Sequence, residues 1–134
     1  MITHDLHWIA AWESLQHHQK LIGDKEQYDL LGQHVSKIWT DISTLNMVHV
    51  QVTSEPYEAL AAPITEFAVF TVKPGESKEK VEEFVDAIAK TLAAMGPSAG
   101  VFGPSWGPIV EHDNKLGLFI GWSSVEVCTV DCPA

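Results

Sequence analysis

The stretch Glu66-Phe-Ala-Val-Phe-Thr-Val72, which leads into Lys73-Pro-Gly75, decides the fold class of this chain. Its β-branched and aromatic residues favour a strand, and the proline and glycine that follow end it. Ser77 can then cap a helix with its hydroxyl, and Gly96-Pro97 stops that helix. The apolar residues between these signals fall at helical spacing: Val81, Phe84, Val85, Ile88, Leu92 and Met95. A strand followed by an amphipathic helix predicts an α+β domain.

Two more extended segments follow this helix. Leu116–Trp122 is mostly apolar and predicts a strand. The other segment, Gly100–Glu111, is interrupted by Gly103-Pro104 and Gly107-Pro108, and such interruptions are typical of an edge or bulged strand.

The residues before position 64 predict a second set of elements. Turn residues and apolar spacing separate these elements from one another. We expect a strand over residues 6–12, a helix from 15 to about 22 capped by Ser14, a helix over 25–40, a strand over 46–53 and a loop over 54–63.

One segment before position 64 resembles a segment near the end of the chain. Leu6–Gln16 and Leu116–Glu126 both read as a strand ending in Trp-x-Ser, with Ser14 and Ser124 placed to cap the next helix. We interpret this echo as an out-of-phase repeat; a chance recurrence is the alternative. Residues 1–53 would be the closing half of one β-α-β-β-α-β unit and residues 64–126 the opening part of the next, within one domain over 1–134.

The composition excludes several classes of protein. The 134 residues include 8 lysines, no arginine and 18 acidic residues, for a formal charge of −10. An acidic chain without arginine lacks the electrostatic footprint of a nucleic-acid binder. No apolar run approaches the roughly 20 residues of a membrane span, and the N-terminus does not resemble a signal peptide. With Cys128 and Cys132 read as reduced thiols, we expect a cytoplasmic protein with no nucleic-acid or membrane partner.

Four of these segments together resemble the antibiotic biosynthesis monooxygenase-like (ABM) domain of the dimeric α+β barrel superfamily, as found in small fungal proteins. They are Ile64–Gly75, the helix after it, Trp106–Glu111 and Leu118–Ser124. The resemblance implies a ferredoxin-like antiparallel sheet with helices on one face. It also implies a homodimer in which two bare sheet faces form a barrel around a small-molecule cavity. Because the chain would begin in mid-domain by this resemblance, a permuted form, a strand-exchanged form and a truncated chain all stay open.

Members of this family include cofactor-independent oxygenases of aromatic polyketides, polyketide cyclases and haem-degrading enzymes. The resemblance therefore implies an enzyme of secondary metabolism that acts on a small apolar or aromatic substrate by oxygenation, cyclisation or dehydration. The chain has no flavin or nucleotide motif, and its histidines lack the spacing of metal ligands, so we expect no cofactor and no metal. A non-catalytic binding or dimerisation module of the same fold is the alternative.

His49 is the candidate general base. Val48, Val50 and Val52 alternate with Met47, His49 and Gln51, and if the valines face the helices, the other three residues face the cavity. A histidine titrates near neutral pH and can take a proton from a phenol or an activated carbon. An ordinary solvent-facing histidine is the structural alternative.

The candidate substrate-binding residues are mostly aromatic, as suits a flat apolar ligand. Leu116, Leu118 and Ile120 are expected to share the pocket side with Trp122. Plain packing in the core or in a dimer interface is an equal alternative for the tryptophans. The full set is Trp8, Trp12, Met47, Gln51, Tyr57, Trp106 and Trp122.

Overall fold

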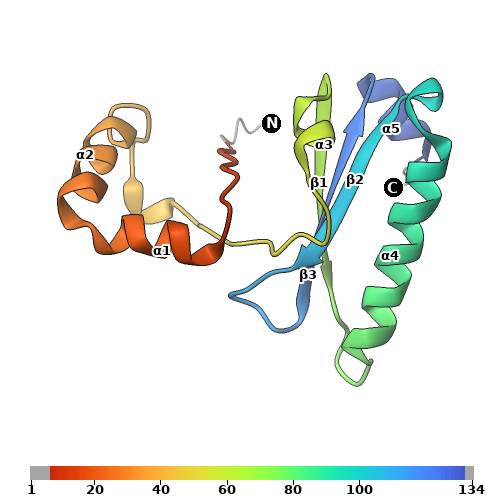
Figure 1. Cartoon of the computed structure of the whole chain (residues 1–134), viewed down its shortest axis with the longest axis horizontal. Coiled ribbons are helices and arrows are strands. Elements are labelled where there is room, and N and C mark those ends of the chain that lie inside the picture. The colour runs from red at the N-terminus through yellow and green to blue at the C-terminus, as the bar shows by residue number, and fades with distance from the viewer. Residues whose placement is uncertain (1–6, 132–134) are drawn as a thin grey trace. The chain divides into compact units, whose positions relative to one another are not determined.

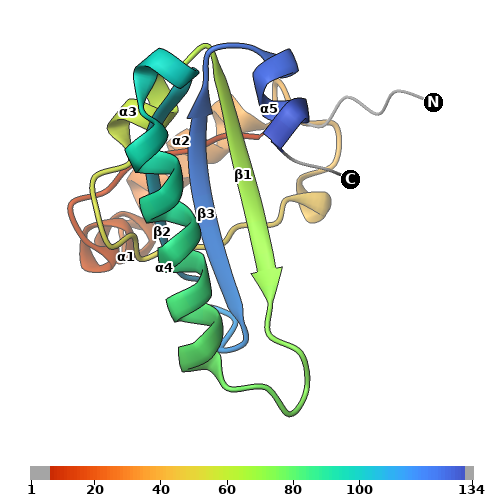
Figure 2. The same cartoon turned by 90° about the vertical axis from the view of Figure 1, so that its right-hand side faces the viewer.

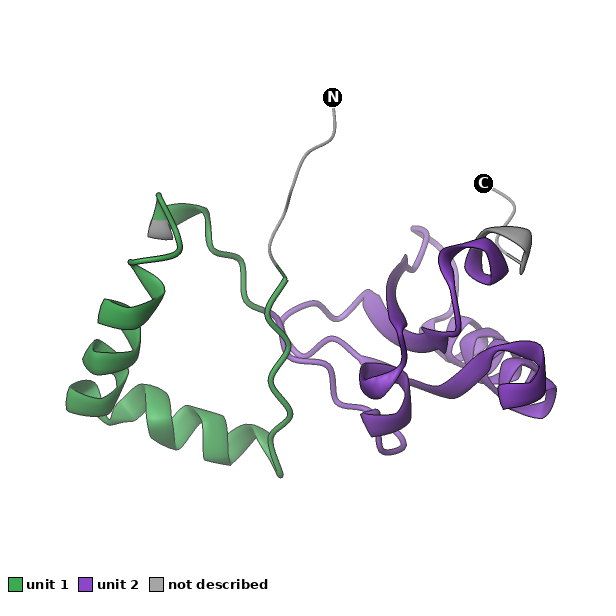
Figure 3. Cartoon of the chain, turned by 90° about the horizontal axis from the view of Figure 1, so that it is seen from above, with its two compact units in different colours: residues 1–47 green, residues 48–134 purple. Residues whose placement is uncertain are grey.

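The computed structural model describes residues 7–131, apart from the side chains of residues 42 and 129–131. The chain divides into two compact units, Met1–Met47 and Val48–Ala134, which are coloured separately in Figure 3. We call them unit 1 and unit 2 and describe each by itself. The fold is α+β, as expected, with a three-stranded antiparallel sheet in unit 2 (Figure 1).

Unit 1 is helical in its described part. Helix α1 (Leu15–Gly23) begins after Ser14, whose hydroxyl accepts the backbone N–H of His17 at 3.3 Å. Helix α2 (Lys25–Val35) begins after Asp24, whose carboxylate accepts the N–H of Gln27 at 3.2 Å. A short 3-10 helix, Ile42–Thr44, follows. The expected Ser14 cap and the helix over 15–22 are therefore confirmed.

Two expectations for unit 1 are wrong. The helix expected over 25–40 ends at Val35, where the Ser36 hydroxyl donates to the carbonyl of Gln33 at 2.9 Å and closes the last turn. The strand expected over 6–12 is absent from its described residues 7–12, which have no regular structure. A strand needs a neighbouring segment that is hydrogen-bonded to it, and none of the described residues of unit 1 belongs to a strand or a bridge.

Unit 1 has almost no interior of its own. Of its described side chains only His18 is buried, and Trp12 stacks on the His18 ring with centroids 4.5 Å apart. Large apolar side chains remain exposed instead: Trp8, Ile9, Trp12, Ile22, Leu30, Ile38, Leu45 and Met47. Helices gain most of their stability by burying an apolar face. The described helices of unit 1 bury little apolar surface of this kind.

Unit 2 contains the sheet. Strand β1 (Ile64–Thr71) and strand β2 (Val101–Pro108) both pair antiparallel with the central strand β3 (Lys115–Trp122), giving the order β1-β3-β2. The register of β2 shifts between Phe102 and Ser105, where Gly103 has a φ of 38°. The prediction of an edge or bulged strand is thus confirmed, and glycine tolerates the positive φ found at this irregularity.

Helix α4 (Lys78–Met95) covers one face of this sheet, which we call the helix face (Figure 2). It begins after Ser77 and ends at Gly96, as predicted. Val85 and Ala89 of α4 pack against alternate residues of β3, which are Leu116, Leu118, Ile120 and Trp122. The 3-10 helix Pro97–Ala99 and the short helix α5 (Val125–Asp131) complete this side, and Val127 of α5 packs against the same core.

The opposite side, which we call the glycine face, carries Phe67, Val69, Phe119 and the three glycines Gly107, Gly117 and Gly121. The pairing register places these residues on one side, alternate to the core residues of β3. Phe67 stacks on Phe119 with centroids 4.6 Å apart. Helix α3 (Tyr57–Ala61) lies over one end of this face, because a Cβ on Gly121 would come within 3.0 Å of the Ala59 Cα. The segment expected to be a loop over 54–63 therefore contains a helix.

Candidate functional site

The extended segment Val48–Thr53 forms the outer edge of unit 2 beside β2. The N–H of Gln51 donates to the carbonyl of Pro108 at 2.9 Å, and the N–H of Thr53 donates to that of Trp106 at 2.7 Å. Val50 forms an isolated bridge with Ile109. The strand expected over 46–53 is thus reduced to a short paired edge, and its first residues lie outside the pairing.

This edge brings His49 against Glu111. The backbone N–H of His49 donates to one carboxylate oxygen of Glu111 at 2.8 Å, and the ring Nδ1 contacts the other oxygen. The N–H of Val110 donates back to the His49 carbonyl at 2.8 Å, which fixes the backbone between the two side chains. The imidazole is 19% exposed and the carboxylate 34% exposed, so both groups are accessible at the surface.

The charge on Glu111 is favoured by this contact. Burial raises the pKa of Glu111, but the hydrogen bonds from the His49 ring and backbone outweigh burial, and the pKa lies below its ordinary value. A carboxylate on Nδ1 orients the ring and favours the tautomer with the proton on Nδ1. A carboxylate that orients an imidazole in this way is also found beside histidines that act as general bases.

His49 does not lie on the face that the sequence predicted. A Cβ on Gly117 would come 3.0 Å from Val50 Cγ2 and 2.8 Å from Phe67 Cε2, so Val50 lies on the glycine face. By alternation His49 points to the other side of this edge. The expectation that the valines face the helices and His49 faces the cavity is therefore reversed. Alternation shows which residues share a face but not which face is covered.

The tryptophans of unit 2 are used in packing. Trp122 is 1% exposed in the core against α4, and its indole N–H donates to Glu66 at 2.9 Å. Trp106 is half-buried on the same face and donates to Asp86 of α4 at 3.1 Å. The expected pocket side of β3, with Leu116, Leu118 and Ile120, is likewise core. Trp122 is therefore a packing residue of the core, which was the alternative to its expected role in a substrate pocket.

The remaining predicted residues are exposed side chains in both units. Tyr57 begins α3 and is 58% exposed, and Gln51 is exposed on the edge segment. Trp8, Trp12 and Met47 are exposed residues of unit 1. His49 and Glu111 are the pair that unit 2 brings together. Glu111 was missed from the sequence because 62 positions separate it from His49.

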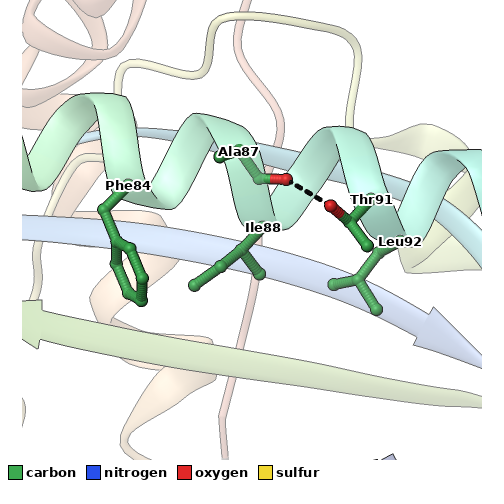
Figure 4. Close-up of a pocket in the computed structure, with 5 residues that line it drawn as sticks. All are labelled: Phe84, Ala87, Ile88, Thr91 and Leu92. Atoms are coloured by element: carbon green, nitrogen blue, oxygen red, sulfur yellow. Dashed lines mark hydrogen bonds between the residues drawn. The ribbon is translucent and has the colours of Figure 1, made fainter.

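A groove on α4 was also missed. Its volume is about 340 Å³, and it is lined by Phe84, Ala87, Ile88, Thr91 and Leu92. Figure 4 shows Phe84, Ile88 and Leu92 projecting from the same side of the helix, while the Thr91 hydroxyl donates to the carbonyl of Ala87 at 2.8 Å. We call these five residues the α4 groove. The predicted apolar stripe of α4 includes Phe84, Ile88 and Leu92, and of these Ile88 and Leu92 also pack against the core.

Comparison with known proteins adds no identification. No family model, no curated protein and no solved structure matches this chain. None of the helices in the described part of the chain is both long enough and apolar enough to cross a membrane.

Proposed function

We propose that this chain is a homodimerisation module that binds a second copy through its glycine face. The observation that carries the proposal is the exposed apolar surface there. Phe67 is 38% exposed although it stacks on Phe119, and Val69 beside it is 49% exposed. Adjacent exposed apolar side chains on a sheet face are typical of a surface that binds a partner. The proposal also agrees with the dimer implied by the resemblance to the ABM domain.

Val69→Glu tests this proposal, because an unpaired carboxylate in an apolar interface is costly. Sedimentation equilibrium should show a dimer for the unchanged chain and at least a 100-fold higher dissociation constant for the variant. Ala94→Glu adds the same charge at an exposed site of α4 and should leave the constant unchanged. A monomeric unchanged chain at micromolar concentration would refute the proposal, as would a Val69→Glu dimer of unchanged affinity.

The His49–Glu111 pair favours a second candidate function. In it, His49 is the general base of a cofactor-independent reaction on a small aromatic or polyketide-like substrate, with Glu111 as the residue that positions the ring. Its support is the fixed carboxylate–imidazole contact at an accessible edge. General-base catalysis of this kind contributes about 10²–10⁴-fold to a rate.

The test uses a panel of polycyclic phenols and linear polyketone analogues, with products identified by mass. Where one compound is turned over, His49→Ala should lower kcat at least 100-fold. Glu111→Gln should lower kcat less, because the ring loses the carboxylate that orients it but keeps its own proton-accepting nitrogen. His112→Ala, in the neighbouring turn, is the control and should keep full activity. An active His49→Ala variant would remove this candidate.

A further inference from the structure

Strand β1 is the outer strand of the sheet, because it stands at one end of the order β1-β3-β2 (Figure 2). Directly after β1, the N–H of Val72 donates to the carbonyl of Asn114 at 2.8 Å, so the backbone groups of Val72 face the chain of β3. Along an antiparallel strand these groups alternate in direction from one residue to the next. The N–H and carbonyl groups that point away from the sheet therefore belong to Thr65, Phe67, Val69 and Thr71.

These outward groups form an open edge. Among the residues that the structure describes, only β3 pairs with β1, and no backbone hydrogen bond reaches the outward groups. The other side of the sheet differs, since the segment Val48–Thr53 is bonded to β2 there. Proteins normally protect an open edge with lysine, proline, a bulge or a short strand. Strand β1 has none of these, because its eight residues include neither lysine nor proline and keep a continuous register with β3.

The one charged residue of β1 does not protect the edge either. The Glu66 carboxylate accepts the indole N–H of Trp122 at 2.9 Å and the thiol of Cys128 at 3.4 Å, so it is already engaged by the protein. On the glycine face, Phe67 and Val69 are exposed. A strand arriving at this edge would meet apolar side chains on the glycine face and a hydrogen-bonded carboxylate on the helix face.

We propose that β1 pairs antiparallel with β1 of a second copy of this chain, so that the two sheets become continuous. The sequence of β1 favours a second copy because it is complementary to itself. One register pairs all the outward residues with one another, and it places Phe67 opposite Val69 and Thr65 opposite Thr71. Aromatic–β-branched pairs and Thr–Thr pairs of this kind stabilise antiparallel strands.

The two-fold axis of this register passes Ala68, which lies opposite the same residue of the other copy. Ala68 is in a non-hydrogen-bonded pair, where the Cα atoms of antiparallel strands approach to about 4.5 Å. A methyl side chain fits this close approach. Glu66 lies opposite Phe70, so the pairing brings no two carboxylates together. Two copies paired in this way form a closed dimer.

This proposal rests on the proposed homodimerisation and names the strand of the second copy that contacts Phe67 and Val69. Its first test is Thr71→Pro, which removes an outward N–H and none of those that face β3. Sedimentation equilibrium should give a dissociation constant at least about tenfold higher, because each dimer loses one interchain hydrogen bond on either side of the axis. Thr71→Val is the matched control, since it keeps the N–H and a β-branched side chain, and should leave the constant unchanged.

A cross-link tests the register directly. In a Cys128→Ser/Cys132→Ser background, Ala68→Cys should form an interchain disulfide on mild air oxidation, because the expected Cα separation is one that a disulfide spans. Ala94→Cys, at an exposed site of α4, is the control and should link far more slowly. Gel electrophoresis without reductant measures both. The cross-link also decides the question if circular dichroism shows that Thr71→Pro is unfolded.

The outcomes separate this proposal from the glycine-face contact. A folded Thr71→Pro dimer of unchanged affinity overturns the edge pairing. A weakened Thr71→Pro dimer without the Ala68→Cys cross-link also overturns it and indicates that a different strand occupies the edge. If Val69→Glu weakens the dimer while both edge tests are negative, the edge pairing fails and the glycine-face contact stands. An unchanged chain that is monomeric at micromolar concentration removes both proposals.

Discussion

Gly107 is the position where one added methyl group should have the largest effect on the candidate site. A Cβ on this residue of β2 would overlap the carbonyl oxygen of Gln51 and lie 2.9 Å from the Cα of Val52. Both neighbours are backbone atoms of the edge segment, so no side-chain rotation relieves the contact. We therefore predict that Gly107→Ala displaces Val48–Thr53 from β2 and separates His49 from Glu111.

The expected cost follows from the contacts that hold this segment. Three backbone hydrogen bonds join it to β2 and the following turn, at 2.9, 2.7 and 2.8 Å, and each contributes about 1 kcal/mol net. Keeping the segment in place would instead force the added Cβ into backbone atoms that no rotamer change can move, which costs more than the roughly 1–3 kcal/mol of ordinary overpacking. The variant takes the cheaper course, so the free energy of unfolding should fall by about 2–3 kcal/mol.

Gly117→Ala is a matched control, because Gly117 is the cross-strand partner of Gly107 on the same face. The atoms nearest to its Cβ would be side-chain ends rather than backbone, Phe67 Cε2 at 2.8 Å and Val50 Cγ2 at 3.0 Å. These ends can move, so a cost of about 1 kcal/mol is expected. Any effect of alanine on the unfolded chain is common to both variants and cancels in the comparison.

The measurements are urea unfolding followed by tryptophan fluorescence, and hydrogen exchange at the amides of Gln51, Thr53 and Val110. Gly107→Ala should lose protection at all three amides, and Gly117→Ala should keep it. Equal stability of the two variants, with the three amides still protected in Gly107→Ala, would refute the close approach of the segment to β2.

Further predictions concern the core and the His49–Glu111 contact. Leu118→Ala should lower the free energy of unfolding by about 2–5 kcal/mol, because Leu118 is 1% exposed in the core; Val110→Ala, at a 43% exposed site, should stay within about 0.5 kcal/mol in the same urea assay. Since the folded pKa of Glu111 lies below its unfolded value of about 4.3, its contribution to stability is present above that pH and is lost as the pH falls through the folded pKa. Glu111→Gln should therefore remove part of the acid sensitivity of unit 2 and reduce protection of the His49 amide at neutral pH, and an unchanged acid limb of the stability curve would contradict this.

Local signals accounted for most elements of unit 2. Helix α4 begins after Ser77 and ends at Gly96 as predicted, because a capping hydroxyl and a helix-ending glycine act within one turn. The interrupted course of β2 was likewise predicted, because the backbone at Gly103 needs a conformation that glycine adopts readily. These features depend on a few neighbouring residues and can be read from the chain itself.

The candidate site could not be read in the same way. His49 was singled out from its alternation with valines, but the sequence placed it on the wrong side of the edge and did not indicate Glu111. Trp122 was assigned to a pocket wall and is core instead. Each error concerns the face or partner of a residue, which depends on the elements that pack against it.

The sequence by itself determined the α+β class, the caps of α1 and α4, the broken course of β2 and the acidic, arginine-free surface. Tertiary structure alone decided which sheet face is covered by α4, how residues 49–53 join β2, and that His49 meets Glu111. The physical reason is the range of the interactions. Caps and turns are hydrogen bonds within a few residues, whereas a face is fixed only when helices and strands distant in the chain bury it together.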